Sequence, residues 1–210
     1  MRAAQLRAAG LLAAVLSGCQ PSTQGPASAE RAPAGLGPLS ACEWCGAAEA
    51  PAELSWDLRI AGEDEPGEAL VLEGRIFLAD GRTPAAGVLM YAYHTNSAGV
   101  YPKRGDETGN GRRHGYLRGW LRTSAEGRYR IRSIRPGAYP DSEQPQHIHV
   151  TLRPPGGEEF WIDDFGFDDD PLLTDAVRAE LDNIGGFGIM VLEGNAGVGW
   201  RGRRDIVLPD

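Results

Sequence analysis

The stretch Arg128-Tyr129-Arg130-Ile131-Arg132 decides the fold class of this chain. Its three arginines alternate with an aromatic and an aliphatic residue. A period of two places successive side chains on opposite faces of a β-strand. We therefore predict a half-buried strand over 128–134, with Tyr129 and Ile131 in a core and the arginines on a solvated face.

Similar short apolar stretches lie on both sides of this strand, and turn residues separate them. The segment Ser124-Ala125-Glu126-Gly127 is typical of a hairpin connection. Strands at this spacing indicate an all-β sandwich with one short helix. Two pieces around 72–81 and 127–139 resemble transthyretin-like sandwich modules, many of which are non-catalytic. The other expected strands are 70–78, 87–94, 119–123, 147–153, 159–165, 188–192 and 204–208, and the expected helix is 171–181.

Composition excludes several classes of protein. The chain has 210 residues, 41% of them hydrophobic, and 29 glycines with 15 prolines favour a turn-rich β protein. A formal net charge of −8 argues against a nucleic-acid binder. Three cysteines are too few for a disulfide scaffold. No apolar run approaches the roughly 18 residues that a membrane span requires.

The N-terminus has the order of an export signal. Two arginines precede a short apolar stretch at 11–16, and no acidic residue occurs before Cys19. The small residues directly before this cysteine resemble the bacterial lipoprotein signal, in which Cys19 would become the acylated first residue. We expect a signal peptide at 1–18 and an exported protein on the periplasmic or outer-membrane side, held to the membrane only by this anchor. The alternatives are an ordinary secretory peptide and an amphipathic start to the fold.

A flexible tether is expected over 19–55, because 20–40 is rich in proline, alanine, glycine and serine without apolar periodicity. It contains the pair Cys42 and Cys45. Catalytic redox chemistry is the lesser alternative for this pair, and a local disulfide is favoured by an oxidising compartment. The remaining residues, 56–210, form the expected sandwich domain.

His147-Ile148-His149 is the sharpest chemical signal. Residues i and i+2 of a strand face the same side, about 7 Å apart along the chain, so these two imidazoles could converge on one metal ion. Such a pair is weak evidence by itself. Its significance depends on what other donor groups the fold brings to it.

Two loop tyrosines accompany the histidines, in Gly99-Val100-Tyr101-Pro102 and Gly137-Ala138-Tyr139-Pro140. Together with 144–149 and 115–120, these motifs resemble the intradiol ring-cleavage dioxygenases over about residues 68–165. The resemblance implies one non-haem Fe(III) ion held by four side chains: Tyr101, Tyr139, His147 and His149.

The same resemblance implies an enzyme that cleaves a catechol-type ring with O₂ to a cis,cis-muconate-type dicarboxylate. In it, Tyr139 would leave the ion when the catechol binds and would take up a substrate proton. Forming a phenolate at neutral pH costs about 4 kcal/mol, which a trivalent cation offsets. Hard anionic oxygen ligands favour the ferric state of iron.

The chain departs from the family pattern at Gln144, where well-known members have an arginine that stabilises charge on the ring. Such assistance contributes several kcal/mol elsewhere. We expect a replacement cation from the basic segment 102–135, with Arg118 as the first candidate and Arg112, Arg113 and Arg122 as others. The alternative function is a non-catalytic transthyretin-like ligand-binding or structural lipoprotein. The sequence is silent on oligomeric state.

The remaining polar signals have structural interpretations. Tyr91 and Tyr93 are expected on one face of their strand and His94 on the other. His114 is expected in a loop near the mouth of the site, without a ligand role. The acidic residues of 163–170 lack the layout of a calcium loop and are read as structural, with Asp170-Pro171 as a helix start.

Overall fold

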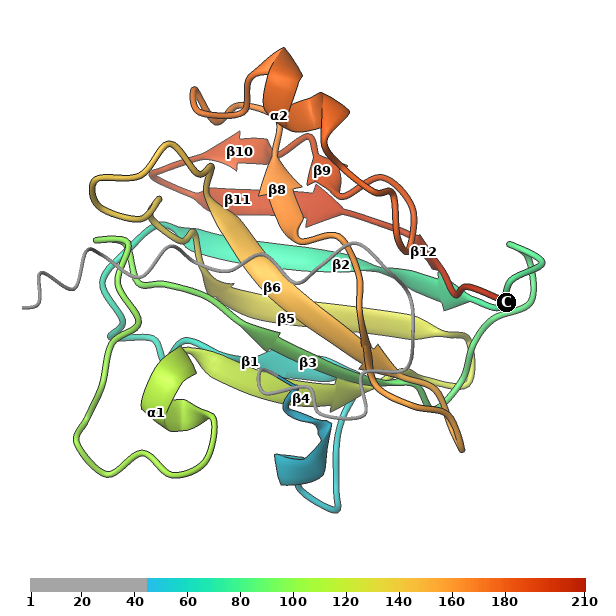
Figure 1. The fold of residues 1–210 in the computed structure, drawn as a ribbon. Helices are drawn as coiled ribbons and strands as arrows, with labels where there is room; N and C mark the ends of the chain where they lie inside the picture. The colour runs from blue at the N-terminus through green and yellow to red at the C-terminus, as the bar shows by residue number, and fades with distance from the viewer. Residues whose placement is uncertain (1–44) are drawn as a thin grey trace, which may run out of the picture. The chain divides into compact units, whose positions relative to one another are not determined.

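The computed structural model describes residues 45–210, and these form a sandwich of two six-stranded sheets (Figure 1). The all-β sandwich expected from the sequence is confirmed. The export signal, Cys19, Cys42 and most of the expected tether lie outside the described residues. Among the helices of residues 45–210, none has the length and apolar character needed to cross a membrane.

The first sheet has the strand order β1-β5-β2-β11-β10, and β12 also pairs with β2. Its central pair is antiparallel, with Leu72 of β2 opposite Ile131 of β5. The strands are β1 Asp57–Arg59, β2 Ala69–Phe77, β5 Arg128–Ile134, β10 Glu193–Asn195, β11 Gly199–Arg203 and β12 Ile206–Val207.

The second sheet has the order β4-β3-β6-β8-β9, and β7 also pairs with β6. Its strands are β3 Leu89–Tyr93, β4 Arg118–Arg122, β6 His147–Arg153, β7 Phe160–Trp161, β8 Phe165–Phe167 and β9 Ile189–Met190. The short helices are η1 Ala47–Glu49, α1 Gly111–His114 and α2 Asp175–Ala179.

The core lies between the sheets and follows the period of two. Leu72 and Ile131 of the first sheet meet Met90, Ile148 and Val150 of the second in one apolar cluster. Each of these side chains is at most 1% exposed, and burying such a side chain contributes about 1.5–3 kcal/mol. The residues between them therefore point away from the core.

On β5 the outward residues are the arginines. Arg130 pairs with Glu73 and Asp57, and Arg132 pairs with Asp57 at 2.6 Å. This confirms the reading of 128–132 as a strand with a buried apolar face and a solvated, ion-paired face. It also leaves these arginines occupied on the first sheet, whereas the histidines of β6 belong to the second.

On β3 and β6 the outward residues are Tyr91, Tyr93, His147 and His149, at positions that alternate with buried Ala92. They lie on the face of the second sheet that is turned away from the first. The segment before η1 covers part of this face, because Trp120 Nε1 of β4 donates to the carbonyl oxygen of Gly46 at 2.7 Å.

The segment 45–50 is packed against the domain, so the tether expected up to residue 55 ends earlier. The backbone N–H groups of Gly46 and Ala47 donate to the two carboxylate oxygens of Glu159 at 3.0 and 2.9 Å. Ala47 is buried. Cys45 is disulfide-bonded, but its partner is not among the described residues, and the expected Cys42–Cys45 pairing stays a prediction.

The strand expected over 159–165 is interrupted. Thr151 of β6 pairs with Trp161 of β7, and Ile148 pairs with Phe165 of β8. Three steps along β6 therefore match four steps along 161–165, which means that this segment carries one extra residue. An extra residue of this kind forms a β-bulge, which redirects neighbouring side chains and is frequent beside active sites.

The helix expected over 171–181 is shorter than predicted. It spans five residues, Asp175–Ala179, and the hydroxyl of Thr174 caps it by accepting from the N–H of Val177. Asp170 does not begin the helix. Its carboxylate accepts from the N–H of Gln146 at 2.6 Å and from that of Leu172 at 2.8 Å, so it joins the start of β6 to the following loop.

Candidate metal centre

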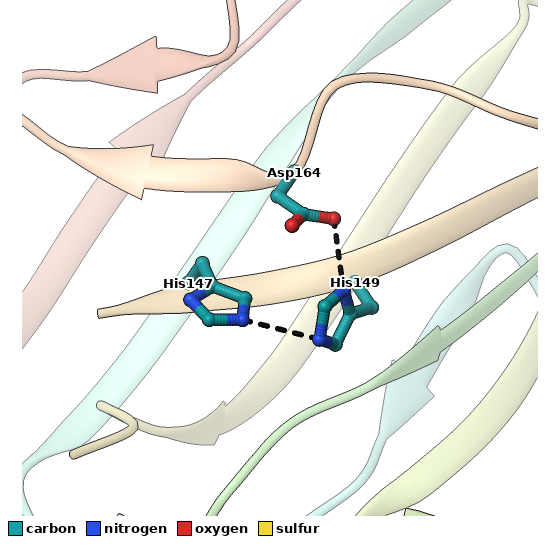
Figure 2. Close-up of side chains that lie close together, drawn as sticks. All are labelled: His147, His149 and Asp164. Atoms are coloured by element: carbon teal, nitrogen blue, oxygen red, sulfur yellow. Dashed lines mark hydrogen bonds and ion pairs between the residues drawn. The ribbon is translucent and has the colours of Figure 1, made fainter. Parts of the chain in front are cut away.

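Strand β6 presents His147 and His149 on the outward face of the second sheet, two residues apart. Their Nε2 atoms lie 3.1 Å from each other. Figure 2 shows the two rings side by side along the strand, with their nitrogens turned toward one another. The convergence that the i, i+2 spacing predicted is present.

The two tyrosines reach this point because their loops are packed together. Gly99 has a φ of +77°, and no room exists for a side chain there, because the carbonyl of Ala138 lies against its α-carbon. Asn96 joins the loops, since its carbonyl accepts from the N–H groups of both Gly99 and Gly137, at 3.0 and 2.9 Å. Glycine at both positions thus allows two remote segments to make one backbone contact.

Tyr101 and Tyr139 extend from these loops so that their hydroxyl groups are hydrogen-bonded to each other. The Tyr139 hydroxyl oxygen also lies 3.1 Å from His149 Nε2 and 3.3 Å from His147 Nε2. Four donor groups from three segments are therefore linked, with Tyr139 in contact with both imidazoles and Tyr101 joined to them through Tyr139. We call this set, Tyr101, Tyr139, His147 and His149, the phenol–imidazole cluster.

The outer nitrogens of the two rings define where their protons are. His147 Nδ1 lies 2.6 Å from the carbonyl oxygen of Pro145, which can only accept a hydrogen bond. His149 Nδ1 lies 3.0 Å from a carboxylate oxygen of Asp164. Both Nδ1 atoms therefore donate, and in neutral rings both Nε2 atoms carry lone pairs.

Two lone pairs 3.1 Å apart cannot bond to each other, and a single phenol proton cannot satisfy both. A cation between the four donors would satisfy all of them. Two nitrogens that are each about 2.1 Å from one ion come to lie about 3.0–3.4 Å apart, which is the spacing found here. The cluster therefore fits a metal ion, and its two phenol oxygens suit a hard, highly charged one.

Asp164 approaches the cluster from outside. Its carboxylate, together with His147 and His149, offers ligand atoms within 4.8 Å of one another. However, Asp164 bonds to Nδ1 of His149, whereas the phenols and His147 face Nε2, as Figure 2 shows for the two rings and the carboxylate. One ion cannot occupy both sides of an imidazole, so Asp164 is a partner of the ligand and not a fifth donor.

Aromatic rings pack against the cluster, whose four side chains are half-buried. Tyr93 stacks on His149 at 4.6 Å between ring centroids and on His114 at 3.6 Å, and Trp161 contacts His149 edge-on. Burial raises the pKa of Tyr139 to about 12, although its hydrogen bond to Tyr101 acts in the opposite direction. Burial also lowers the pKa of His147, which favours its neutral ring.

Arg118 is not brought to the phenol–imidazole cluster. It lies on the same face, but its guanidinium pairs with Glu49 at 2.7 Å and lies over the ring of Trp120. Tyr93 stands between it and His149 in the pairing of the strands. The other arginine candidates are exposed and also have no described contact with the cluster: Arg112, Arg113 and Arg122.

Gln144 lies in the loop before β6 and is half-buried. Its backbone N–H donates to the hydroxyl of Ser142, and its side chain has no described contact with the cluster. Arg135 contacts this loop, because it donates to the side chain of Gln146 at 2.8 Å, and it also pairs with Asp169. The guanidinium of Arg135 is therefore already neutralised.

The other histidines and two further tyrosines lie on β3, directly after it, or on α1. His94 faces the core as expected, fully buried, with its Nε2 hydrogen-bonded to the hydroxyl of Ser133. His114 does not lie in a loop near the mouth of the site: it belongs to α1, is buried, and bonds to the hydroxyl of Tyr91 at 2.7 Å. Tyr91 and Tyr93 share one face, and Tyr93 contacts a candidate ligand directly.

Asp164 lies in the acidic stretch for which the sequence predicts structural roles, and it is hydrogen-bonded to His149. That reading holds for its neighbours. Asp163 accepts from the N–H groups of Asn183 and Ile184, and Asp168 pairs with Arg178. The bulge in 161–165 turns Asp164 toward His149, and the spacing of residues in the sequence does not predict this bulge.

Comparison with known proteins agrees with this geometry. A family model described as Dioxygenase matches residues 46–184. Catechol 1,2-dioxygenase 2 of Acinetobacter lwoffii is 31% identical over 149 residues, which cover 57% of this chain and 52% of that protein. The protocatechuate 3,4-dioxygenase beta chain of Burkholderia cepacia is 35% identical over 117 residues, covering 51% and 48%. The match thus spans about half the length of these relatives.

Solved structures extend the comparison to the fold. The dioxygenase domain of a dioxygenase carbohydrate-binding protein fusion from Streptomyces sp. SirexAA-E has a TM-score of 0.57 at 26% identity, over 75% of this chain and 90% of that one. The intradiol ring-cleavage dioxygenase from Tetranychus urticae has a TM-score of 0.54 at 19% identity, over 75% and 88%, and shows the fold alone. The family match, the relatives and the sandwich fold together show that the chain belongs to the intradiol ring-cleavage dioxygenase family.

Proposed function

We propose that this protein is a non-haem Fe(III) intradiol dioxygenase, which cleaves a catechol-type ring with O₂ to a cis,cis-muconate-type dicarboxylate. The observation that carries the proposal is the phenol–imidazole cluster: the Tyr139 oxygen lies 3.1–3.3 Å from both Nε2 atoms, and the Tyr101 hydroxyl is hydrogen-bonded to it. Family membership supports the same chemistry.

Bound Fe(III) would hold both catechol oxygens and draw electron density from the ring, so that ring carbon becomes open to attack by O₂. His147 and His149 would keep their orientation throughout, because Pro145 and Asp164 fix their outer nitrogens. Tyr101 and Tyr139 would supply two negative charges, which favour the ferric state.

Tyr139 is the residue placed to move a proton. Its oxygen has three neighbours in the cluster, whereas that of Tyr101 has a described hydrogen bond only to Tyr139. Burial raises the pKa of both phenols, so the contacts with the two imidazoles, and not the pKa, distinguish Tyr139. We therefore assign to Tyr139 the uptake of one catechol proton during substrate binding, and to Tyr101 a permanent ligand role.

Gln144 gives the site less positive charge than an arginine at this position would. A neutral amide can donate a hydrogen bond to a substrate oxygen, but it cannot neutralise charge that develops on the ring. Arg118, paired with Glu49, is not placed to replace that charge. We therefore expect turnover to favour catechols that are already electron-rich and need less stabilisation.

Oxygen uptake by the iron-loaded full-length protein over a panel of catechols tests the proposal. The expected result is consumption of one O₂ per ring and a dicarboxylate product, with loss of activity in Tyr139→Phe and His147→Ala. A yellow semialdehyde, the product of extradiol cleavage, would contradict the ferric mechanism. Iron binding without O₂ uptake across the panel would favour the non-catalytic alternative.

We also propose that the protein is exported and anchored through a lipid on Cys19, with the sandwich domain outside the cytoplasm. The support is the order of charged, apolar and small residues in 1–19. Replacing Cys19 by Ala should move the protein from the membrane to the soluble fraction of cells. Continued membrane fractionation of the variant would count against the anchor.

A further inference from the structure

Among residues 45–210, Asp164 is the acidic residue grouped with His147 and His149, and it contacts His149 at the nitrogen that faces away from the other donors. Its Oδ1 atom accepts a hydrogen bond of 3.0 Å from Nδ1 of His149, and its side chain is 35% exposed. A carboxylate behind a metal-bound imidazole fixes the tautomer and the ring orientation, and it makes the other nitrogen a stronger donor.

The fold places this carboxylate by a specific device. In an unbroken ladder that continued from Trp161 opposite Thr151, residue 163 would stand opposite His149. The extra residue in 161–165 changes the register, so that Asp164 faces His149 while Ile162 remains buried and donates to the carbonyl of Val150. The bulge thus keeps the core filled and turns one carboxylate outward to the histidine.

Charge balance gives the carboxylate a second consequence. The two tyrosines of the cluster supply two negative charges when both are ligands, and the ferric ion has three positive charges. Asp164 would supply the third negative charge at the outer nitrogen of one ligand. The described contacts give Asp164 no arginine partner, in contrast to Asp168 and Asp169, which pair with Arg178 and Arg135.

We propose that Asp164 is a positioning residue for the metal centre: through His149 Nδ1 it orients the imidazole and balances the third charge of a trivalent ion. This inference rests on the proposed function, because it takes the phenol–imidazole cluster to be the iron site. It assigns to this hydrogen bond a share of the preference of the site for trivalent over divalent metal, in addition to the share of the two phenolates.

Three variants separate orientation from charge. Asp164→Asn is nearly isosteric and retains a carbonyl oxygen for His149 Nδ1, but it removes the charge. Asp164→Ala removes both the charge and the acceptor, and Asp164→Glu retains the charge. Asp168→Asn is the matched control, because it makes the same chemical change in the same segment at a surface ion pair.

The readouts are metal affinity and the visible spectrum, and neither requires turnover. Affinities for Fe(III), Ga(III) and Zn(II) are measured by competition with chelators. We expect Asp164→Asn to bind Fe(III) and Ga(III) roughly 10–100-fold more weakly, with a smaller change for Zn(II). We expect Asp164→Ala to lose more, and Asp164→Glu to recover part of the affinity.

The phenolate-to-iron absorption band should move to longer wavelength in Asp164→Asn, because a weaker imidazole donor leaves the ferric ion a better electron acceptor. Asp168→Asn should match the wild type in affinity and spectrum. If Asp164→Asn and Asp164→Ala also match it, the inference is wrong while the iron site stands.

Two other results are distinguishable. If Asp164→Ala abolishes metal binding while Tyr101→Phe and Tyr139→Phe do not weaken it, Asp164 is a direct ligand and the positioning role is overturned. If the wild-type protein takes up no Fe(III), the proposed function fails and this inference fails with it. Circular dichroism of each metal-free variant checks that the sandwich has formed.

Discussion

The contact between the two tyrosine loops should control metal binding, and Gly99→Ala tests it. A Cβ atom at position 99 would lie 2.8 Å from the carbonyl carbon of Ala138, and nearer still to its oxygen. Carbon atoms normally approach to about 3.5–4.0 Å, so the loops would have to separate by roughly 1 Å. Functional donors are held within about 0.5 Å, so this displacement should remove one phenol from the cluster.

The backbone conformation of Gly99 contributes a separate effect. Its φ of +77° costs an alanine about 1–2 kcal/mol, whether or not the loops collide. Gly105 provides the matched control, because it has a φ of +99° and no heavy atom lies within 4 Å of an added Cβ. Gly105→Ala therefore carries the backbone strain without the collision.

Affinity for Fe(III) and the melting temperature are to be measured for both variants. We expect Gly105→Ala to lower the melting temperature slightly and Gly99→Ala to lower it further, because only Gly99→Ala adds the collision to the backbone strain. Only Gly99→Ala should bind Fe(III) about 10–100-fold more weakly, with a weaker visible band. If Gly99→Ala and Gly105→Ala bind iron equally well, the packing of the two loops does not position the tyrosines, and this reasoning is refuted.

Three further predictions concern the core, a buried histidine and proton release. Leu72→Ala should lower the free energy of unfolding by about 2–5 kcal/mol in denaturant titrations, while Val71→Ala, on the other face of β2, should cost less than half as much. Burial lowers the pKa of His94 to about 4, below its usual 6.5, so the neutral form is favoured in the folded state. Stability should therefore fall by about 3 kcal/mol as pH decreases from 6.5 to 4, and unfolding curves of His94→Asn should show a shallower decline. Binding of Fe(III) from one chelate at pH 7 should release one proton fewer in Tyr139→Phe than in the wild type, measured by calorimetry in buffers of different ionisation enthalpy; equal release would exclude Tyr139 as a phenolate ligand.

Much of the fold could be predicted because the alternation of apolar and polar residues along a strand shows which side chains are buried. The bounds of β5 and β6 agree with the ranges read from the sequence, 128–134 and 147–153, since each has a clear apolar face. Strands β10 and β11 were missed, because Gly194, Gly199 and Gly202 replace the side chains that would have formed a pattern. Their pairing with β2 is decided by the tertiary structure.

The candidate ligands could be predicted by residue type but not by geometry. The motifs identified the four side chains, but their meeting depends on Gly99 and Gly137, which let two remote loops touch. The role of Asp164 depends on a one-residue change of register, which the sequence of 159–165 does not reveal. The placement of Arg118 depends on Glu49, a residue that we had assigned to the tether.

Resonance Raman spectroscopy of the iron-loaded protein, excited within its visible band, tests the central claim most directly. The account predicts enhanced vibrations of tyrosinate bound to Fe(III), which weaken in Tyr101→Phe and in Tyr139→Phe and change when a catechol is added. Iron bound without any tyrosinate vibration would contradict the claim that Tyr101, Tyr139, His147 and His149 hold one ferric ion.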